Sequence, residues 1–346
     1  MKTSVKFVLL AVCCLVSLAV GIGVGSVGIT PGDMLAILAH KLFGAALPAG
    51  TDPTQVSILW SIRLPRVLAA FAVGGLLAIS GVVFQSVLGN PLASSYTLGV
   101  SSGASLGAAI VMMLGITPLG IFTLPVAGFV FGLATVLLAI AFAARVDKGL
   151  KNNTIILVGM VFSLFVSAIL TLLNALNREY MQQLLLWQMG SFAGRTFPQV
   201  AVLAGALVLG LVFLVRYSRE MDILTFGDDA SRALGVESGR VKLVLLVAVS
   251  LLTGTAVCFT GTIGFVDLIS PHLVRKLFGP GHRVLLPASA LFGGAFMVLA
   301  DVVSRTLIAP LELPVGAVTA LIGAPFFAWI YFSRASRKRA ARGKGV

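Results

Sequence analysis

The chain has 346 residues, of which 58% are hydrophobic and only 11% are charged, and its mean hydropathy is +1.05. Apolar stretches at this density exclude an ordinary soluble domain and indicate a membrane protein. A formal net charge of +13 would favour nucleic-acid binding in a soluble protein. In a membrane protein, Lys and Arg gather instead in cytoplasmic loops and set the orientation, so we expect no nucleic-acid partner.

Apolar segments of membrane-spanning length recur along the whole chain. A bilayer core about 30 Å thick needs about 20 apolar residues per helix. We therefore predict an all-α polytopic membrane protein with about ten transmembrane helices. The predicted spans are residues 5–28, 65–88, 95–115, 122–145, 154–176, 196–216, 243–261, 263–278, 284–307 and 315–333. Because segment 263–278 is short and contains Pro271, we expect it to cross the membrane only in part.

The first span also resembles a secretory signal peptide, since Lys2 and Lys6 precede an apolar run over residues 7–24. The run is long for a signal peptide, and no A-x-A cleavage site follows it. We interpret it as an uncleaved first transmembrane helix.

Residues 29–64 form a predicted outer loop. Thr30 has the side chain to cap a helix, and Pro31 suits the first helical position. The apolar spacing after Pro31 is typical of an amphipathic helix on the membrane surface.

Residues 217–242 form the longest polar loop on the predicted inner side. Asp228 or Asp229 suits a helix cap, and Gly235 suits a helix end. A second short turn is predicted to open at Glu237 and Ser238. We therefore expect a pair of short helices along the membrane surface.

Basic residues choose the orientation. The loop 217–242 and the tail 334–346 are both rich in Lys and Arg, so we place both termini in the cytoplasm. All but six of the 25 Lys and Arg residues then lie on the cytoplasmic side. The six exceptions are Lys41, Arg63, Arg66, Arg178, Arg195 and Arg305.

Short sequence blocks, in a fixed order, add a second kind of information. They are IRLPR at 62–66, SGVVFQ at 80–85, NPLA at 90–93, LGVSSGA at 98–104, IGFVDLISPHLVR at 263–275, HRVLLP at 282–287, LADVVSR at 299–305 and ELPVGAVTALIGAPFFAWI at 312–330. In this order the chain closely resembles the permease subunits of type II ABC importers for iron–siderophore complexes, haem and cobalamin. The resemblance extends from about Gly28 onward.

This resemblance implies a single permease domain over residues 1–346, with a coupling loop at about 217–242 and a basic cytoplasmic tail at 334–346. Such permeases form homodimers or pseudo-dimers in a bacterial or archaeal cytoplasmic membrane, and substrate passes between the subunits. ABC ATPase subunits bind the cytoplasmic face, and an extracytoplasmic substrate-binding protein docks outside. Membrane lipid is the remaining partner.

The sequence agrees with this division of labour, because it contains no GxxxxGK[ST] loop to cradle ATP phosphates. We therefore expect a transport subunit that is not itself an enzyme and binds no cofactor. ATP and Mg would be bound by the partner ATPase subunits.

The resemblance assigns the ATPase-coupling role to the centre of the inner loop. A compact knob with an apolar centre and a charged rim suits a protein socket. The alternative is a solvated loop whose arginines serve only topology. The candidate residues are Ala230, Arg232, Leu234, Gly235, Val236 and Arg240.

Three arginines at outer span ends, Arg63, Arg66 and Arg305, oppose the usual charge bias. In the family, matching arginines receive glutamates of the binding protein, and the guanidinium fork suits such pairing. The alternative is contact with lipid phosphates.

Three asparagines are gate candidates. By resemblance, Asn90 faces the inner mouth of the pathway, and Asn152 and Asn153 match positions of an inner constriction. The family usually has small hydroxyl residues at the last two positions. Asn90–Pro91 is also a helix-ending turn, and both roles are compatible.

Two carboxylates lie inside predicted spans. Asp301 is spaced to pair with Arg305 at i, i+4. Asp267 stands where the family usually has Gly, and it either bonds backbone freed by Pro271 or faces the pathway. An ion-coupled or proton-coupled secondary carrier that uses both carboxylates is the alternative function.

Other chemistry has less support. Cys13, Cys14 and Cys258 lie in apolar runs, and the three histidines fall on different segments, so we expect neither disulfides nor a metal site. His272 is interpreted as a packing residue. The sequence contains no nucleophile–base or metal constellation of the kind that an intramembrane enzyme would need.

Overall fold

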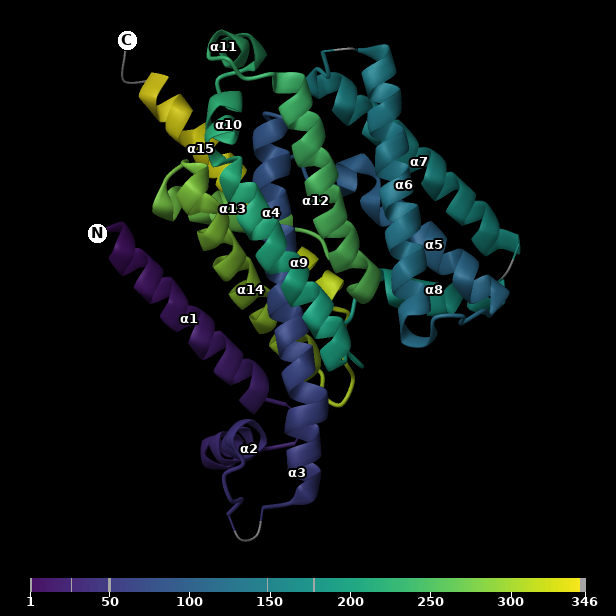
Figure 1. The fold of residues 1–346 in the computed structure, drawn as a ribbon, viewed down its shortest axis with the longest axis vertical. Coiled ribbons are helices and arrows are strands. Elements are labelled where there is room, and N and C mark those ends of the chain that lie inside the picture. Colours follow the sequence, from purple (N-terminus) through teal and green to yellow (C-terminus); the bar gives the residue numbers. More distant parts are fainter. Residues whose placement is uncertain (1, 26, 49–50, 148, 177, 343–346) are drawn as a thin grey trace.

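A computed structural model of the chain describes residues 2–25, 27–48, 51–147, 149–176 and 178–342, without the side chains of 178 and 329–342. The basic side chains predicted for the tail therefore lie outside the described part. The described chain is a bundle of helices (Figure 1). The α-helices are α1 Thr3–Gly23, α2 Pro31–Phe43, α3 Pro53–Ser57, α4 Leu64–Val87, α5 Val100–Leu114, α6 Thr123–Val146, α7 Asn152–Leu176, α8 Met181–Gln188, α9 Phe197–Arg216, α10 Ser218–Leu224, α11 Asp228–Ala233, α12 Ser238–Thr260, α13 Val266–Phe278, α14 His282–Thr306 and α15 Val315–Arg342.

The predicted fold class is confirmed. Within the described residues, seven helices are long and apolar enough to cross a membrane, and α5 and residues 315–328 of α15 are shorter apolar helices. The remaining predicted span, residues 263–278, corresponds to α13, which has 13 residues with Pro271 inside. At about 1.5 Å per residue it is too short for a full crossing.

Helix α4 lies at the centre of the bundle, and 89% of its most apolar window is buried. Its glycines allow neighbouring backbones to approach closely. A Cβ at Gly74 would lie 2.2 Å from the carbonyl oxygen of Gly293 on α14, and one at Gly81 would lie 1.9 Å from that of Asp267 on α13. Helices in lipid associate through such close contacts, because lipid offers no hydrophobic driving force between them.

Proline in α13 creates a local problem that a side chain on α4 solves. Pro271 has no N–H, so the carbonyl of Asp267, four residues earlier, loses its helical partner. Gln85 donates its Nε2 to that carbonyl at 3.2 Å, and Arg275 donates to Gln85 Oε1 at 3.0 Å. The freed backbone is thus satisfied by Gln85. The hypothesis that the Asp267 carboxylate does so is wrong, since this carboxylate accepts its hydrogen bonds from Ser95.

Two element boundaries differ from the sequence prediction. The helix predicted to begin at residue 65 is continuous from Pro53, through a π-helical segment Ile58–Arg63. The segment predicted over 95–115 is divided at Gly99, whose φ of +83° ends a 3₁₀ turn before α5 begins. Hydropathy alone marks neither a π turn nor a left-handed glycine.

The loop helices were predicted in part. Thr30 Oγ1 accepts a hydrogen bond from the backbone N–H of Asp33 at 3.2 Å, and Pro31 opens α2, as predicted. Helix α8 was not predicted, because eight residues give too little periodicity to distinguish a helix from a loop.

We expect Gly81→Val to destabilise the bundle by about 3 kcal/mol or more, because the new side chain meets the rigid backbone of α13. The measurement is the thermal unfolding midpoint of the detergent-purified chain. Gly205→Ala on α9 is the control, since nothing lies within 4 Å of its added Cβ. Equal midpoints for Gly81→Val and wild type would contradict the close packing of α4 on α13.

Candidate functional site

The end of the bundle that carries α10 and α11, here called the α11 end, contains the predicted coupling loop (Figure 1). A helix does begin at Asp228, but Gly227, with φ +94°, occupies the cap position. Asp228 pairs instead with Lys242. The prediction of a second short turn is wrong. Glu237 occupies the N-cap position of α12, and α12 continues from Ser238 as a spanning helix. The partner of α11 is α10, on its other side.

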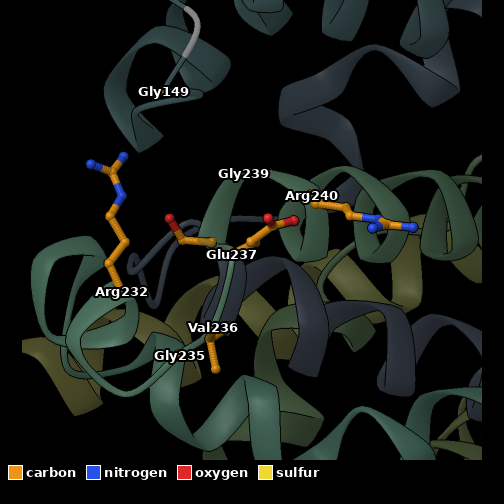
Figure 2. Close-up of a pocket in the computed structure, with 8 residues that line it drawn as sticks. Gly149, Arg232, Gly235, Val236, Glu237, Gly239 and Arg240 are labelled. Carbon is orange, nitrogen blue, oxygen red and sulfur yellow. The ribbon is translucent and has the colours of Figure 1, made fainter.

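Most predicted coupling residues are accessible. Arg232, Leu234, Gly235 and Arg240 are exposed, and Ala230 and Val236 are half-buried. Four of the six border a shallow pocket of about 480 Å³ between α11, the start of α12 and Gly149 (Figure 2). In this view the Arg232 guanidinium extends toward Gly149. The pocket therefore joins the coupling loop to the connection between α6 and α7.

Exposed apolar side chains flank α11. Leu234 is 61% exposed and Phe226 is 74% exposed. Phe226 was missed by the sequence analysis, although an aromatic residue within a polar loop is a usable signal. These two residues therefore place large apolar side chains at a polar end of the molecule, where water reaches them.

Asp147 organises the connection between α6 and α7. It accepts hydrogen bonds from the backbone N–H groups of Gly149 at 2.9 Å and Lys151 at 3.3 Å. These bonds, that from Gly149 foremost, favour the ionised carboxyl and hold the pKa of Asp147 below its usual value.

The structure places two of the three gate candidates near each other at the α11 end. Asn90 Oδ1 accepts from the N–H of Leu92 at 2.9 Å, as a turn residue does. Asn152 opens α7, and a Cβ at neighbouring Gly89 would lie 3.1 Å from its Nδ2. Asn153 is exposed. The gate role itself remains a prediction.

A line of three polar residues fixes α10 to the bundle. Asp222 Oδ1 lies 2.5 Å from His282 Nδ1 on α14, and His282 Nε2 lies 2.5 Å from Ser86 Oγ on α4. The sequence analysis found no nucleophile–base constellation, because these residues are far apart in the chain. Ser86 is nevertheless 6% exposed and bonded to the Val82 carbonyl, so the line is a clamp between helices and not a hydrolase site.

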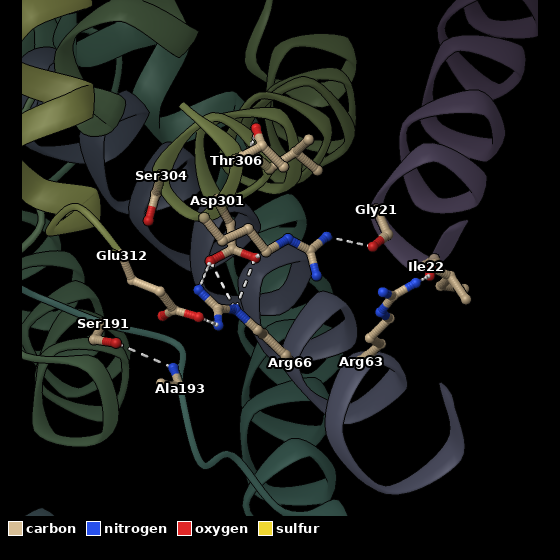
Figure 3. Close-up of polar contacts among 12 residues, drawn as sticks. Gly21, Ile22, Arg63, Arg66, Ser191, Ala193, Asp301, Ser304, Thr306 and Glu312 are labelled. Carbon is tan, nitrogen blue, oxygen red and sulfur yellow. Dashed lines mark hydrogen bonds and ion pairs between the residues drawn. The ribbon is translucent and has the colours of Figure 1, made fainter. Parts of the chain in front are cut away.

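The opposite end, which carries α2 and is here called the α2 end, gathers the three predicted docking arginines. Figure 3 labels two of them, Arg63 and Arg66. Arg66 donates to Asp301 on α14 at 2.9–3.1 Å and to Glu312 at 2.8 Å. Arg63 donates to the carbonyl of Gly23 at 2.9 Å. Arg305 donates to the carbonyl of Gly21. Each therefore has a partner inside the chain and is less than a tenth exposed.

The predicted i, i+4 pair of Asp301 and Arg305 is the weaker of two contacts. Their closest atoms are 3.7 Å apart, whereas Arg66 holds Asp301 at 2.9 Å. Local spacing identified Arg305, but the helix packing brings Arg66 closer.

All three arginines border one cavity of about 220 Å³, together with Glu312. The Glu312 side chain is 45% exposed, whereas Asp301 is 1% exposed. Three cations against two carboxylates leave the cavity cationic. Glu312 begins one of the sequence blocks that carry the family resemblance, but no role was predicted for this residue.

Asp267 borders a separate cavity of about 500 Å³, whose lining includes Tyr96, Thr262 and Gly316. Its Oδ2 accepts from the N–H of Ser95 at 3.1 Å and from Ser95 Oγ at 3.0 Å. Asp267 thus ties α13 to the turn before α5 and also borders a cavity.

Comparisons with known proteins agree with this architecture. Residues 9–333 match the FecCD transport family. The chain belongs to the FecCD transport family. It is 43% identical over 317 residues to the uncharacterized ABC transporter permease protein YvrB of Bacillus subtilis, covering 91% of this chain and 90% of YvrB. It is 39% identical over 297 residues to the cobalamin import system permease protein BtuC of Halobacterium salinarum, covering 85% and 79%. For the vitamin B12 import system permease protein BtuC of Escherichia coli the identity is 35% over 322 residues, covering 93% of each chain.

Solved structures give the same result. A metal-chelate type ABC transporter in an inward-facing conformation matches this FecCD chain with a TM-score of 0.81 at 30% identity, covering 94% of this chain and 97% of that one. PsaBC of Streptococcus pneumoniae matches with a TM-score of 0.55 at 20% identity, covering 77% and 89%, and shares the fold.

The alternative of a secondary carrier fits this FecCD chain poorly. Ion or proton coupling needs a carboxylate that exchanges its partner, whereas Asp301 accepts three hydrogen bonds from Arg66. The relatives of this chain are ABC permeases, so the prediction of an ABC importer permease stands.

We expect Arg66→Met to lower the stability of the chain by about 3 kcal/mol, because it leaves Asp301 buried without its main cation. Adding Asp301→Asn should recover part of the loss. The thermal unfolding midpoint of the purified protein measures both effects. Lys41→Met, an exposed cation on α2 at the same end, is the control. If the double variant unfolds at a lower temperature than Arg66→Met, the pair is not the source of the stability.

Proposed function

We propose that this chain forms, with a second copy of itself, the transmembrane pathway of an ATP-driven importer for a metal chelate or corrinoid, of the class of iron–siderophore complexes, haem and cobalamin. The observation that carries the proposal is similarity over nearly the whole chain to cobalamin permeases and to a metal-chelate type transporter. The relatives include permeases for cobalamin and a transporter of metal-chelate type, so transport measurements decide between these substrates.

We place the α11 end in the cytoplasm of a bacterium or archaeon. The basic loop 217–242 lies at this end, and Lys and Arg favour the cytoplasmic side. There, Phe226 and Leu234 provide exposed apolar contacts within a rim that includes Arg232 and Arg240. An apolar centre with a charged rim is the anatomy of a protein interface, so this surface suits the ATPase subunits. Those subunits would bind ATP and Mg, since this chain has no phosphate-binding loop.

The cationic cavity at the α2 end suits acidic side chains of a substrate-binding protein. Arg63 and Arg305 donate hydrogen bonds to backbone carbonyls. A carbonyl carries no net charge, so these bonds do not neutralise the two guanidinium charges. Glu312 pairs with Arg66 from a partly exposed position, so an incoming carboxylate can displace it from Arg66. Docking would thus exchange one carboxylate for another with little loss of hydrogen bonding.

The need for a second copy follows from size. The cavity of about 500 Å³ beside Asp267 is that of a site for a drug-sized ligand. A corrinoid or ferric chelate is larger, so a pathway for it needs walls from two subunits.

We expect proteoliposomes that contain the chain, its ATPase subunits and its binding protein to accumulate a ferric siderophore, haem or cobalamin only when Mg-ATP is supplied. Radiolabelled uptake of each compound measures this, and the chain without its ATPase subunits should hydrolyse no ATP. A sodium or proton gradient that drives uptake without ATP would contradict the proposal.

We expect Glu312→Gln to strengthen docking of the binding protein several-fold, because the competing charge on Arg66 is removed. The dissociation constant at low and high salt measures it. Glu179→Gln is the matched control, since Glu179 is exposed and lies in a loop on the same side of the membrane in the proposed topology. Weaker docking of Glu312→Gln would show instead that Glu312 itself contacts the partner.

A further inference from the structure

Lys242 near the start of α12 is a buried cation with partners on two other segments, α11 and the connection between α6 and α7. The residue is 1% exposed. Its Nζ lies 2.7 Å from Asp228 Oδ1, and it donates to Asn152 Oδ1 at 2.6 Å and to the Leu150 carbonyl at 3.4 Å. An ammonium has three donors, so these three partners account for all of them. A lysine that served only the charge bias of the loop would need no such burial.

The partners belong to two regions of the α11 end: Asp228 to the loop segment, and Leu150 and Asn152 to the connection that leads into α7. Asp228 opens α11, the helix at the exposed coupling surface. Asn152 opens α7 and lies beside Gly89, next to the Asn90 turn. Leu150 lies between α6 and α7. One ammonium therefore joins the coupling surface to the residues predicted to form the inner gate.

The backbone at Leu150 has a conformation that needs support. Its φ is +49°, in the left-handed region that residues other than glycine rarely adopt. Such a backbone persists only where the surrounding structure holds it. Lys242 donates to the carbonyl of Leu150, and the N–H of Leu150 donates to the carbonyl of Asp147 at 3.0 Å. Loss of the lysine would release this turn on one side.

We propose that Lys242 is a positioning residue that transmits movement of α11 to the connection between α6 and α7 and to Asn152. The inference rests on the proposed function for its role in transport, but the mechanical link exists in the chain alone. ATP-driven displacement of α11 moves the carboxylate of Asp228. Because Lys242 holds that carboxylate and the gate residues together, they move as one unit.

The first experiment tests the link without transport. Hydrogen exchange is measured on the purified chain, with Lys242→Met as the variant and Lys151→Met as the matched control. Lys151 is an exposed cation two residues from the Gly149 amide. We expect Lys242→Met to speed exchange of the amides of Gly149, Leu150 and Lys151 at least tenfold and to leave α2 unchanged. Unchanged exchange at those amides would overturn the proposal, whatever the transport activity.

The second experiment measures transported substrate per ATP hydrolysed in the reconstituted importer. We expect Lys242→Met to lower this ratio about fivefold or more at equal ATPase association, the scale of a typical coupling between sites, while Lys151→Met keeps it. Asp228→Asn combined with Lys242→Met should lose no more than Lys242→Met alone, because both act through one contact. A ratio equal to wild type overturns the proposal.

A folding defect is separated by a milder change. Asn152→Leu keeps the branching and the number of side-chain heavy atoms but removes one acceptor of Lys242, and Asn152 is only half-buried. It should lower the ratio in the same direction, and a wild-type ratio would again overturn the proposal. Failure of the wild-type importer to use ATP would refute the proposed function alone, since the hydrogen-exchange result does not depend on it.

Discussion

The close approach of α4 to α13 and α14 is the constraint on which the rest of the structure depends. Gly74, Gly81 and Gly293 bring helix backbones into contact, so α4 is enclosed along nearly its whole length. Polar groups at both of its ends are consequently inside the protein. Arg66 at one end and Gln85 and Ser86 at the other must find partners there, because a buried polar group without a partner is costly. Their partners on α13 and α14 therefore form the polar ties of the molecule.

The two ends use charge differently. At the α2 end, Arg66 is shared between a buried carboxylate, Asp301, and an exposed one, Glu312. The buried carboxylate fixes the arginine from inside the bundle, and the exposed carboxylate pairs with it on the solvent side. At the α11 end, Lys242 and His282 lie on the spanning helices α12 and α14, and their carboxylate partners, Asp228 and Asp222, belong to the loop segment.

This arrangement fastens the loop segment that carries α10 and α11 at two points. Asp222 is bound to α14 through His282, and Asp228 is bound to α12 through Lys242. The Asp222 and Asp228 side chains are 46% and 28% exposed, so these are not fully buried pairs, and each contributes modestly by itself. Two attachments on different helices nevertheless prevent the segment from sliding along either one. A force on its exposed surface is therefore transmitted into the bundle.

Sequence reasoning succeeded where information is local. Hydropathy located the long apolar helices and the two shorter ones, α5 and the start of α15. Thr30 and Pro31 marked the start of α2, and Asp228 is the first residue of α11, although Gly227 holds the cap position. It failed where the partner is distant in the chain. The pairing of Asp301 with Arg305 was chosen because i, i+4 spacing can be read directly, whereas Arg66 lies 235 positions away. Lys242, Glu312 and the Ser86–His282–Asp222 line were missed for the same reason, since only the packed helices bring them together. The resemblance to a family supplied the roles but not these contacts.

Asp267 shows how the same packing decides the meaning of one unusual residue. Its backbone carbonyl fills the space that Gly81 leaves, and Gln85 satisfies that carbonyl. The side chain is directed to Ser95, which donates two hydrogen bonds to one carboxylate oxygen. Among the described residues the other oxygen has no hydrogen-bond partner. Because one oxygen of this carboxylate binds the turn that carries Ser95, Asp267 links α13 to the start of α5. Its position beside the cavity then follows from that tie, since the turn that carries Ser95 also carries Tyr96, which lines the same cavity.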